Sequence, residues 1–215
     1  MSTRVALRAR LRPMTAADIA QIMDIERESF PSMWPQTAYR RELQNKLARY
    51  IVLAETADEA PPAPGQGHER LWGAIRKIVA GGDGAPAADG RVLGFIGVWL
   101  MVGEAHIVTV AVRDAYRRTG IGERLLIAIL DLAMDAGQDE ATLEVRASNQ
   151  SAQRLYLKYA FVRAGVRARY YTDNHEDAVL MTARDITSPA YRTFFAGLRA
   201  EHQAHHPDLW PEATA

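Results

Sequence analysis

Apolar and polar positions change their spacing several times along the chain, and each change marks a predicted element. Residues 5–12 alternate apolar with charged side chains, which is typical of a strand with one buried face. After Thr15 the apolar spacing lengthens to that of a helix, and a carboxylate three residues beyond this threonine fits a capped N-terminus. A rigid turn at 30–35 and a second short helix to about residue 46 then lead to a strand at 50–54.

The pattern is more regular beyond residue 90. Short apolar runs predict strands at 92–102, 104–112, 141–146, 161–170 and 178–182, and helical spacing predicts helices at 120–134 and 148–159. Gly103 separates the first two of these strands and predicts a hairpin turn. A last helix begins after Ser188 and places four apolar side chains on one face, those of Tyr191, Phe194, Phe195 and Leu198. This mixture predicts an α+β domain with a largely antiparallel sheet.

Residues 57–90 interrupt the pattern with clustered prolines and glycines, which are typical of linkers. Within this segment, residues 71–79 have the pattern of a short basic helix. Long low-complexity connections are unusual inside a compact domain, so we interpret the segment as a surface insertion and not as a domain boundary. The predicted organisation is one domain over residues 1–185, carrying the insertion, and a C-terminal helical extension over residues 186–215.

Composition narrows the function. The chain balances 26 basic against 26 acidic side chains, whereas a protein that binds duplex nucleic acid normally has a basic excess, so direct nucleic-acid binding is not expected. The absence of cysteine excludes disulfides, thiolate metal sites and a cysteine nucleophile. The longest apolar run is about half the length of a membrane helix, and the N-terminus lacks the apolar core of a signal peptide. We therefore expect a cytoplasmic protein with no membrane contact.

The three histidines of the C-terminal extension do not have the ordered spacing of a metal site. We expect His202, His205 and His206 to be solvated, and no metal to be bound. The sequence leaves the oligomeric state open.

The segment 109–123 (TVAVRDAYRRTGIGE) carries the first chemical signal. An apolar strand runs into a loop with arginines and glycines that opens directly onto a helix, and the amides of a helix N-terminus attract phosphate. Gly120 and Gly122 allow the main chain to approach an anion closely, and Arg117 and Arg118 add positive charge. The spacing is neither that of a P-loop nor that of a Rossmann loop. A plain structural turn is the alternative interpretation.

A second segment, 143–161 (LEVRASNQSAQRLYLKYAF), favours the phosphate-binding loop over the plain structural turn. Together the two segments resemble the GNAT superfamily of N-acetyltransferases, whose phosphate loop reads Arg/Gln-x-x-Gly-x-Gly/Ala. More narrowly, the chain is similar to the bacterial ribosomal-protein-alanine N-acetyltransferases. The similarity includes the strand end LEVRASN, the tyrosine of RLY, the aromatic of YAF, an Arg-x-Tyr-Tyr segment ending at Tyr171, and Glu-Asp-Ala at 176–178. It covers residues 7–182 without the insertion.

This resemblance implies a GNAT fold, in which helices flank a mixed, mostly antiparallel sheet that splays open between two strands. Acetyl-CoA would bind as co-substrate in that gap, between the strand ends at 110–112 and 143–146. The implied contacts are main-chain groups of Val110, Ala111 and Val112 for the pantetheine, residues Arg117, Arg118, Thr119, Gly120, Ile121, Gly122 and Glu123 for the pyrophosphate, and Asn149 and Tyr156.

The resemblance also implies the catalytic groups. An α-amine with a pKa of ~8 must lose a proton before it attacks, and the leaving thiolate must gain one. Glu144 matches the general base of the family and Tyr156 its general acid. His106 precedes the cofactor-binding segment and is either a further catalytic group or a structural histidine. The alternative for Glu144 is an ion pair with Arg146 or Arg169, and for Tyr156 a place in the helix core.

For the acceptor, the Phe30-Pro31 turn and the Tyr170-Tyr171 pair resemble two family loops that hold a peptide N-terminus. The resemblance therefore implies acetylation of the N-terminal α-amine of a protein, and of a ribosomal protein in particular. Ordinary aromatic packing is the alternative for these side chains. Two other functions stay open: acetylation of a lysine or of a small-molecule amine, and an acetyl-CoA-binding module with weak catalysis.

Overall fold

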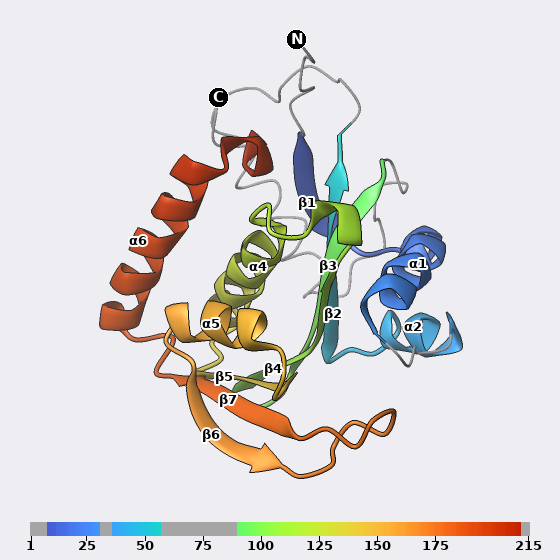
Figure 1. Ribbon diagram of the computed structural model, residues 1–215. Helices are drawn as coiled ribbons and strands as arrows, with labels where there is room; N and C mark the ends of the chain where they lie inside the picture. The colour runs from blue at the N-terminus through green and yellow to red at the C-terminus, as the bar shows by residue number, and fades with distance from the viewer. Residues whose placement is uncertain (1–7, 31–35, 57–89, 212–215) are drawn as a thin grey trace.

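The computed structural model describes residues 8–30, 36–56 and 90–211. In this part of the chain a seven-stranded sheet forms the centre of the molecule (Figure 1). Its strands are β1 (Ala9–Pro13), β2 (Ala48–Glu55), β3 (Val92–Leu100), β4 (Glu104–Val112), β5 (Glu140–Arg146), β6 (Val162–Arg167) and β7 (Ala178–Arg184). They lie in the order β1-β2-β3-β4-β5-β7-β6, and only β4 and β5 among these neighbours are parallel. The predicted α+β class is confirmed.

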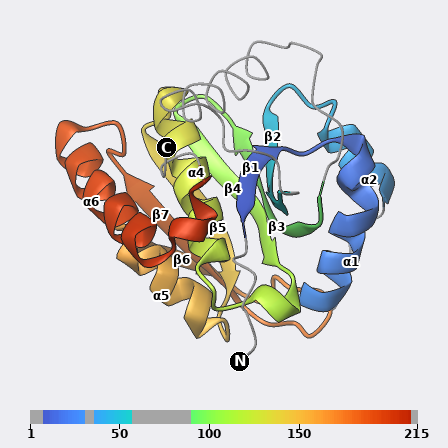
Figure 2. The same cartoon turned by 90° about the horizontal axis from the view of Figure 1, so that it is seen from above.

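Helices cover both faces of the sheet. They are α1 (Ile19–Ser29), α2 (Gln36–Glu42), α4 (Ile121–Asp135), α5 (Gln150–Lys158) and α6 (Pro189–His205), with short 3₁₀ turns η1 (Ala16–Asp18), η2 (Asp114–Tyr116) and η3 (Pro207–Leu209). Figures 1 and 2 show α1 and α2 on one face and α4, α5 and α6 on the other. None of the helices in the described ranges is long and apolar enough to span a membrane.

Successive residues of a strand point to opposite faces of the sheet and pack into two different apolar cores. On β2, Ile51 and Leu53 pack in the core that includes α4, whereas Tyr50 and Val52 pack in the core that includes α1. Fully burying side chains of this size contributes about 1.5–3 kcal/mol each, so the two cores account for much of the driving force for folding. The sheet is therefore fixed from both sides.

Several local predictions are confirmed. Thr15 and Asp18 form a capping box at the start of η1 and α1. Gly103 makes the hairpin between β3 and β4, with a φ of 79° that favours glycine. Ser188 caps α6 by accepting a hydrogen bond from the main-chain nitrogen of Tyr191 at 3.2 Å.

Several predictions differ from the structure. The second helix, expected to reach about residue 46, ends at Glu42, and the strand expected over 92–102 ends at Leu100. The strand expected to reach residue 170 ends at Arg167, because it is an edge strand paired only with β7 and the pairing stops there. Phe194 on α6 is 43% exposed, while Tyr191 and Phe195 are buried, so the apolar face of α6 is narrower than expected. The helix predicted at 71–79 and the side chain of Pro31 lie outside the described residues.

The feature that positions the site is the divergence of β4 from β5. The two strands pair only from Glu104 opposite Glu140 to Ile107 opposite Leu143. Beyond these residues β4 remains paired with β3, and β5 remains paired with β7. The sheet is therefore splayed between its two parallel strands, as expected, and main-chain groups on the facing edges are left without a strand partner.

Candidate active site

The predicted phosphate loop lies at the end of β4 and opens onto α4. Gly120 is the N-cap of α4 and has a φ of 87°, a conformation that side chains other than glycine rarely adopt. A Cβ at this position would lie 2.7 Å from the ring of His206, so there is also no room for one. The first amides of a fifteen-residue helix thus face the loop, and this arrangement favours phosphate.

The two arginines of the loop have different environments. Arg117 donates to the carbonyl of Val112 at 3.2 Å, to the carbonyl of Glu28 at 3.1 Å and to the hydroxyl of Ser29 at 3.0 Å, so it ties the loop to the last turn of α1. Arg118 is exposed, has a φ of 61° and forms no ion pair within the described ranges. Arg118 is thus the arginine available to a bound anion.

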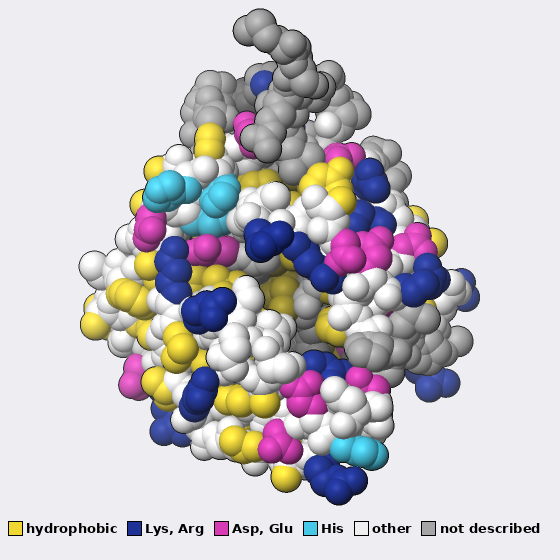
Figure 3. All heavy atoms as spheres, viewed as in Figure 1, with side chains coloured by type: hydrophobic (Ala, Val, Ile, Leu, Met, Phe, Trp, Pro, Cys, Tyr) yellow, Lys and Arg dark blue, Asp and Glu magenta, His cyan; other side chains and the backbone are white. Residues whose placement is uncertain are grey.

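The remaining loop residues are held by local contacts. Thr119 donates its hydroxyl hydrogen to the carbonyl of Tyr116 at 2.6 Å, and the side chain of Ile121 is buried in the core. Gly122 has room for a Cβ, which would be 3.7 Å from Val112. Of the two glycines, only Gly120 is therefore required by the backbone. Figure 3 shows the face of the molecule at this loop, with basic side chains beside a hollow that has apolar side chains within it.

Glu123 turns its side chain away from the loop. Its carboxylate accepts hydrogen bonds from the hydroxyl of Tyr159 at 2.8 Å and from Lys158 at 2.9 Å. Burial acts to raise the pKa of Glu123, but these two donors outweigh it and hold the pKa below its usual value. Any contact of Glu123 with an anion would therefore come from its main chain.

The C-terminal extension contacts this loop directly, which the sequence did not indicate. His202 is 2% exposed, with Nε2 at 2.9 Å from the carbonyl oxygen of Gly120 and Nδ1 accepting from the indole of Trp210 at 3.0 Å. The indole also lies under the guanidinium of Arg124, 3.5 Å from its ring centroid. The prediction that His202 is solvated is wrong; His205 is exposed, as predicted.

The hydrogen bonds of His202 define its protonation. A carbonyl accepts only, so Nε2 carries the hydrogen, and Nδ1 must have a free lone pair to accept from an indole N–H. Burial lowers the pKa of His202 to about 4, which agrees with a neutral ring. No group of three potential metal ligands occurs in the described part of the chain.

Glu144 lies at the point where β4 and β5 separate, one residue beyond the last pair. Its side chain is 7% exposed, with one oxygen 3.3 Å from Nε2 of His106 and the other 3.0 Å from the guanidinium of Arg167. The suggested ion pairs with Arg146 and Arg169 are absent from the described contacts, since Arg146 binds Asp173 at 2.9 Å instead. Arg167 on β6 was not found from the sequence.

His106 continues a polar row across the two strands. Its Nδ1 lies 2.8 Å from the hydroxyl oxygen of Thr142, which faces it in the register of β4 and β5. The hydroxyl of Thr142 in turn donates to the carboxylate of Glu104. His106 is therefore not an isolated structural histidine, because it connects Glu144 to two further polar groups.

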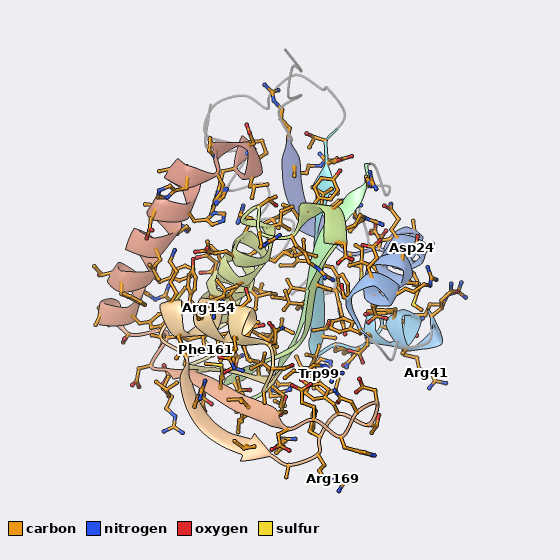
Figure 4. All side chains as sticks on the ribbon, viewed as in Figure 1. Asp24, Arg41, Trp99, Arg154, Phe161 and Arg169 are labelled. Carbon is orange, nitrogen blue, oxygen red and sulfur yellow. The ribbon has the colours of Figure 1, made fainter. Side chains whose placement is uncertain are left out.

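Tyr156 on α5 is 5% exposed and packs against Phe161, with ring centroids 5.8 Å apart. Burial raises the pKa of Tyr156 above its usual value, so the hydroxyl keeps its proton at neutral pH. Trp99 lies on the other side of the site, 6.3 Å from the ring of His106. Figure 4 labels Trp99 near the end of β3 and Phe161 beside α5.

The other predicted contacts are placed as follows. Val110 and Val112 lie on the part of β4 beyond its pairing with β5, and Ala111 between them is buried. The side chain of Asn149 caps α5 by accepting from the main-chain nitrogen of Ala152 at 3.1 Å. Its amide hydrogens are thus the part of Asn149 left for a ligand.

The aromatic groups of the predicted acceptor site are only partly brought together. Tyr170 and Tyr171 are in edge contact, with centroids 5.3 Å apart, and Arg146 stacks over Tyr171 at 3.9 Å. Burial raises the pKa of Tyr171 to about 12. Phe30 packs with the core under α1, and Pro31 lies outside the described residues.

Comparison with known proteins agrees with this geometry. The sequence profile described as "Acetyltransferase (GNAT) family" matches residues 19–161. A Bacillus subtilis protein provisionally named [ribosomal protein bS18]-alanine N-acetyltransferase is 30% identical over 175 residues, which cover 81% of this chain and 94% of that protein. The N-alpha-acetyltransferase of Sulfurisphaera tokodaii is 29% identical over 187 residues, covering 81% of this chain and 92% of that one.

Comparison with solved structures finds proteins of the same kind. The crystal structure of the ribosomal-protein-S18-alanine N-acetyltransferase from Escherichia coli superposes with a TM-score of 0.62 at 23% identity, covering 82% of this chain and 94% of that one. A sheet splayed between its parallel strands, a phosphate loop at the start of α4 and the matching family profile lead to one conclusion. This chain belongs to the GNAT family and is an acetyl-CoA-dependent N-acetyltransferase.

Proposed function

We propose that this enzyme transfers the acetyl group of acetyl-CoA to the N-terminal α-amine of a protein, and that the acceptor is a ribosomal protein in the cytoplasm. The observation that carries the proposal is the pairing of Glu144 with His106, 3.3 Å apart at the opening of the splay. It supplies proton acceptors where an amine would meet the thioester. The Bacillus subtilis relative, whose name specifies a ribosomal-protein alanine, supports the choice of acceptor.

Acetyl-CoA would lie along the unpaired edge of β4. Main-chain groups of Val110 and Val112 would bind the pantetheine, and the amides that begin α4 at Gly120 would bind the pyrophosphate, with Arg118 adding charge. Arg117 contributes indirectly, since its bonds to α1 hold the loop in place. In this proposal, residues 1–185 form the catalytic unit and 186–215 an extension that supports the phosphate loop.

The reaction removes two protons from the nitrogen and adds one to the sulfur. Glu144 accepts the proton of the ammonium group, and the neutral nitrogen attacks the thioester carbonyl, whose oxygen becomes an oxyanion near the amides of the Val110 segment. When the carbon–sulfur bond breaks, the thiolate takes the hydroxyl proton of Tyr156. The nitrogen, positively charged after its attack, loses its second proton to solvent as the amide forms, and Tyr156 is protonated again from solvent. Because burial keeps Tyr156 protonated, the acid is ready at neutral pH.

The tyrosine pair favours a peptide N-terminus over a lysine side chain. An α-amine carries its backbone amides within two or three bonds, so the hydroxyls of Tyr170 and Tyr171 could bond them. A lysine amine stands on a four-carbon stem and offers no such amides. Burial and, to a smaller extent, the negative charge of Glu144 raise the pKa of Tyr171, which supports a place for this side chain at the amine.

A panel of acceptors tests this proposal. Acetyl-CoA is offered with a peptide that begins with alanine and has a ribosomal-protein sequence, with spermidine and with an aminoglycoside, and free thiol and product mass are followed. We expect the peptide to be the preferred acceptor. Faster turnover of spermidine or of the aminoglycoside would instead indicate a small-molecule acetyltransferase, and thiol release with none of them would favour a binding module.

A further inference from the structure

Four polar side chains form a continuous row on β4 and β5: Glu104, Thr142, His106 and Glu144. The row follows the register, because His106 lies opposite Thr142 in the parallel pair. Thr142 is 8% exposed and has both of its hydrogen-bonding partners within this row. Such an arrangement leaves few choices for where each proton sits.

The proton positions follow from the donors and acceptors available. Glu104 is about a third exposed, and a carboxylate can only accept hydrogen bonds. The single hydroxyl hydrogen of Thr142 therefore points to Glu104. Its oxygen must then accept from His106, so the hydrogen of a neutral His106 ring sits on Nδ1 and not on Nε2.

This tautomer leaves the other ring nitrogen without a hydrogen. Nε2 of His106 faces an oxygen of Glu144 at 3.3 Å, so two acceptors face each other with room for one proton between them. Arg167 on the second carboxylate oxygen, at 3.0 Å, offsets the negative charge of Glu144. The pair is thus poised to take up one proton and share it.

The opposite tautomer of His106 would prevent the pair from taking up a proton. With its hydrogen on Nε2, His106 would donate to Glu144, and the place for an incoming proton would already be filled. An isolated imidazole next to a carboxylate prefers to donate to it, because a charge-assisted hydrogen bond is the stronger one. Something must therefore hold the hydrogen on Nδ1, and Thr142 is the group in contact with that atom.

We propose that Thr142, itself oriented by Glu104, is a positioning residue that fixes the tautomer of His106 so that the His106–Glu144 pair can receive the proton of the acceptor amine. The inference rests on the proposed function in one respect, that Glu144 takes this proton. It adds two residues, Thr142 and Glu104, whose effect on the reaction passes through His106.

Nitrogen NMR of the imidazole rings tests the tautomer without any acceptor. In protein labelled at histidine, with the His106 signals assigned from a His106→Gln variant, we expect the Nδ1-protonated form in the wild type. Thr142→Val keeps the shape of the side chain and removes the hydroxyl, so it should switch His106 to the Nε2-protonated form. Thr142→Ser should restore the wild-type spectrum.

Kinetics supply the second readout. Thr142→Val should lower kcat about tenfold or more, with acetyl-CoA affinity unchanged, and Thr142→Ser should recover most of the rate. Thr182→Val is the matched control, since Thr182 is buried on β7 directly opposite Thr142 and should affect neither readout. An Nε2-protonated ring in the wild type, or an unchanged ring in Thr142→Val, would overturn the inference. Failure to acetylate peptides, with the expected NMR result, would count against the proposed acceptor alone.

Discussion

At the scale of single residues, the proposed catalysis depends on where one proton goes. Glu144 is buried at the opening of the splay and has a partner on each oxygen, His106 and Arg167. A carboxylate in this position can accept a proton from an amine without moving, because its neighbours already fix its orientation. Arg146, two residues along the strand, pairs with Asp173 and Glu176 instead.

Replacing this carboxylate should show its role. Glu144→Gln removes the proton acceptor but keeps the size, so kcat should fall by roughly 10²- to 10⁴-fold while acetyl-CoA affinity changes little. The loss should be smaller at high pH, where the amine is already neutral. Steady-state kinetics and calorimetry measure the two effects. Glu140→Gln is the control, since Glu140 is on the same strand and pairs with Arg184 at 3.2 Å. An active Glu144→Gln variant beside an inactive His106→Ala variant would assign the base to His106.

The sequence predicts some of these residues and not others, for a physical reason. Glu144 and Tyr156 occur in contiguous segments whose local pattern resembles that of a known family. Arg167 and Thr142 act through contacts between strands, so their roles depend on the register of β4, β5 and β7 and on the order of the sheet. A local sequence pattern does not determine which residues pair between neighbouring strands.

At the scale of elements, the start of α4 is the critical junction. Gly120 and Gly137 both have positive φ, 87° and 72°, so alanine at either position should cost about 1–2 kcal/mol in backbone strain. Only at Gly120 would the new Cβ also meet a ring, that of His206 at 2.7 Å, while nothing lies within 4 Å at Gly137. Gly120→Ala should therefore weaken acetyl-CoA binding about tenfold or more, and Gly137→Ala should not. Equal affinities by calorimetry would contradict the loop assignment.

The contact between α6 and this junction should make stability depend on pH. The folded protein holds His202 neutral with its pKa lowered to about 4, whereas an unfolded chain binds the proton near pH 6.5. Between these values only the unfolded state gains a proton, so His202 stabilises the fold fully above pH 6.5 and progressively less as pH falls toward 4. The loss should be about 1–3 kcal/mol.

Denaturant unfolding at pH 7 and pH 4.5 measures this effect as a difference between variants. The wild type should lose more unfolding free energy between the two pH values than His202→Gln does. His205→Gln, which changes an exposed histidine on the same helix, should behave like the wild type. The same pH dependence in His202→Gln and the wild type would rule out a neutral, buried His202.

The extension also shows what an amphipathic pattern leaves undetermined. Helical spacing and the Ser188 cap predict α6 correctly, because both are local. They do not identify the surface on which the helix docks. Nothing near His202 in sequence indicates that its ring meets Gly120, a residue 82 positions earlier in the chain.

At the scale of the whole molecule, the ends of the segment at 57–89 meet in the sheet. Ala54 pairs with Val92, and the main-chain nitrogen of Glu55 donates to the carbonyl of Arg91 at 2.9 Å. A short turn can join antiparallel neighbours. Replacing residues 60–89 with a brief Gly/Ser linker should therefore leave the melting temperature and the rate of peptide acetylation largely unchanged. A large loss of kcat in a variant that still folds would show that the segment contributes to the acceptor site.

In the proposed function, the whole molecule presents acetyl-CoA to an N-terminal α-amine. The most direct test compares one lysine-containing peptide in two forms, with its N-terminus free and with it blocked, and follows acetylation of each by intact mass. The half-buried hydroxyl of Tyr171, left unpaired by a lysine, would cost about 1–3 kcal/mol, so the free form should react about tenfold faster or more, at its α-amine. Equal rates for the free and the blocked peptide would contradict the account.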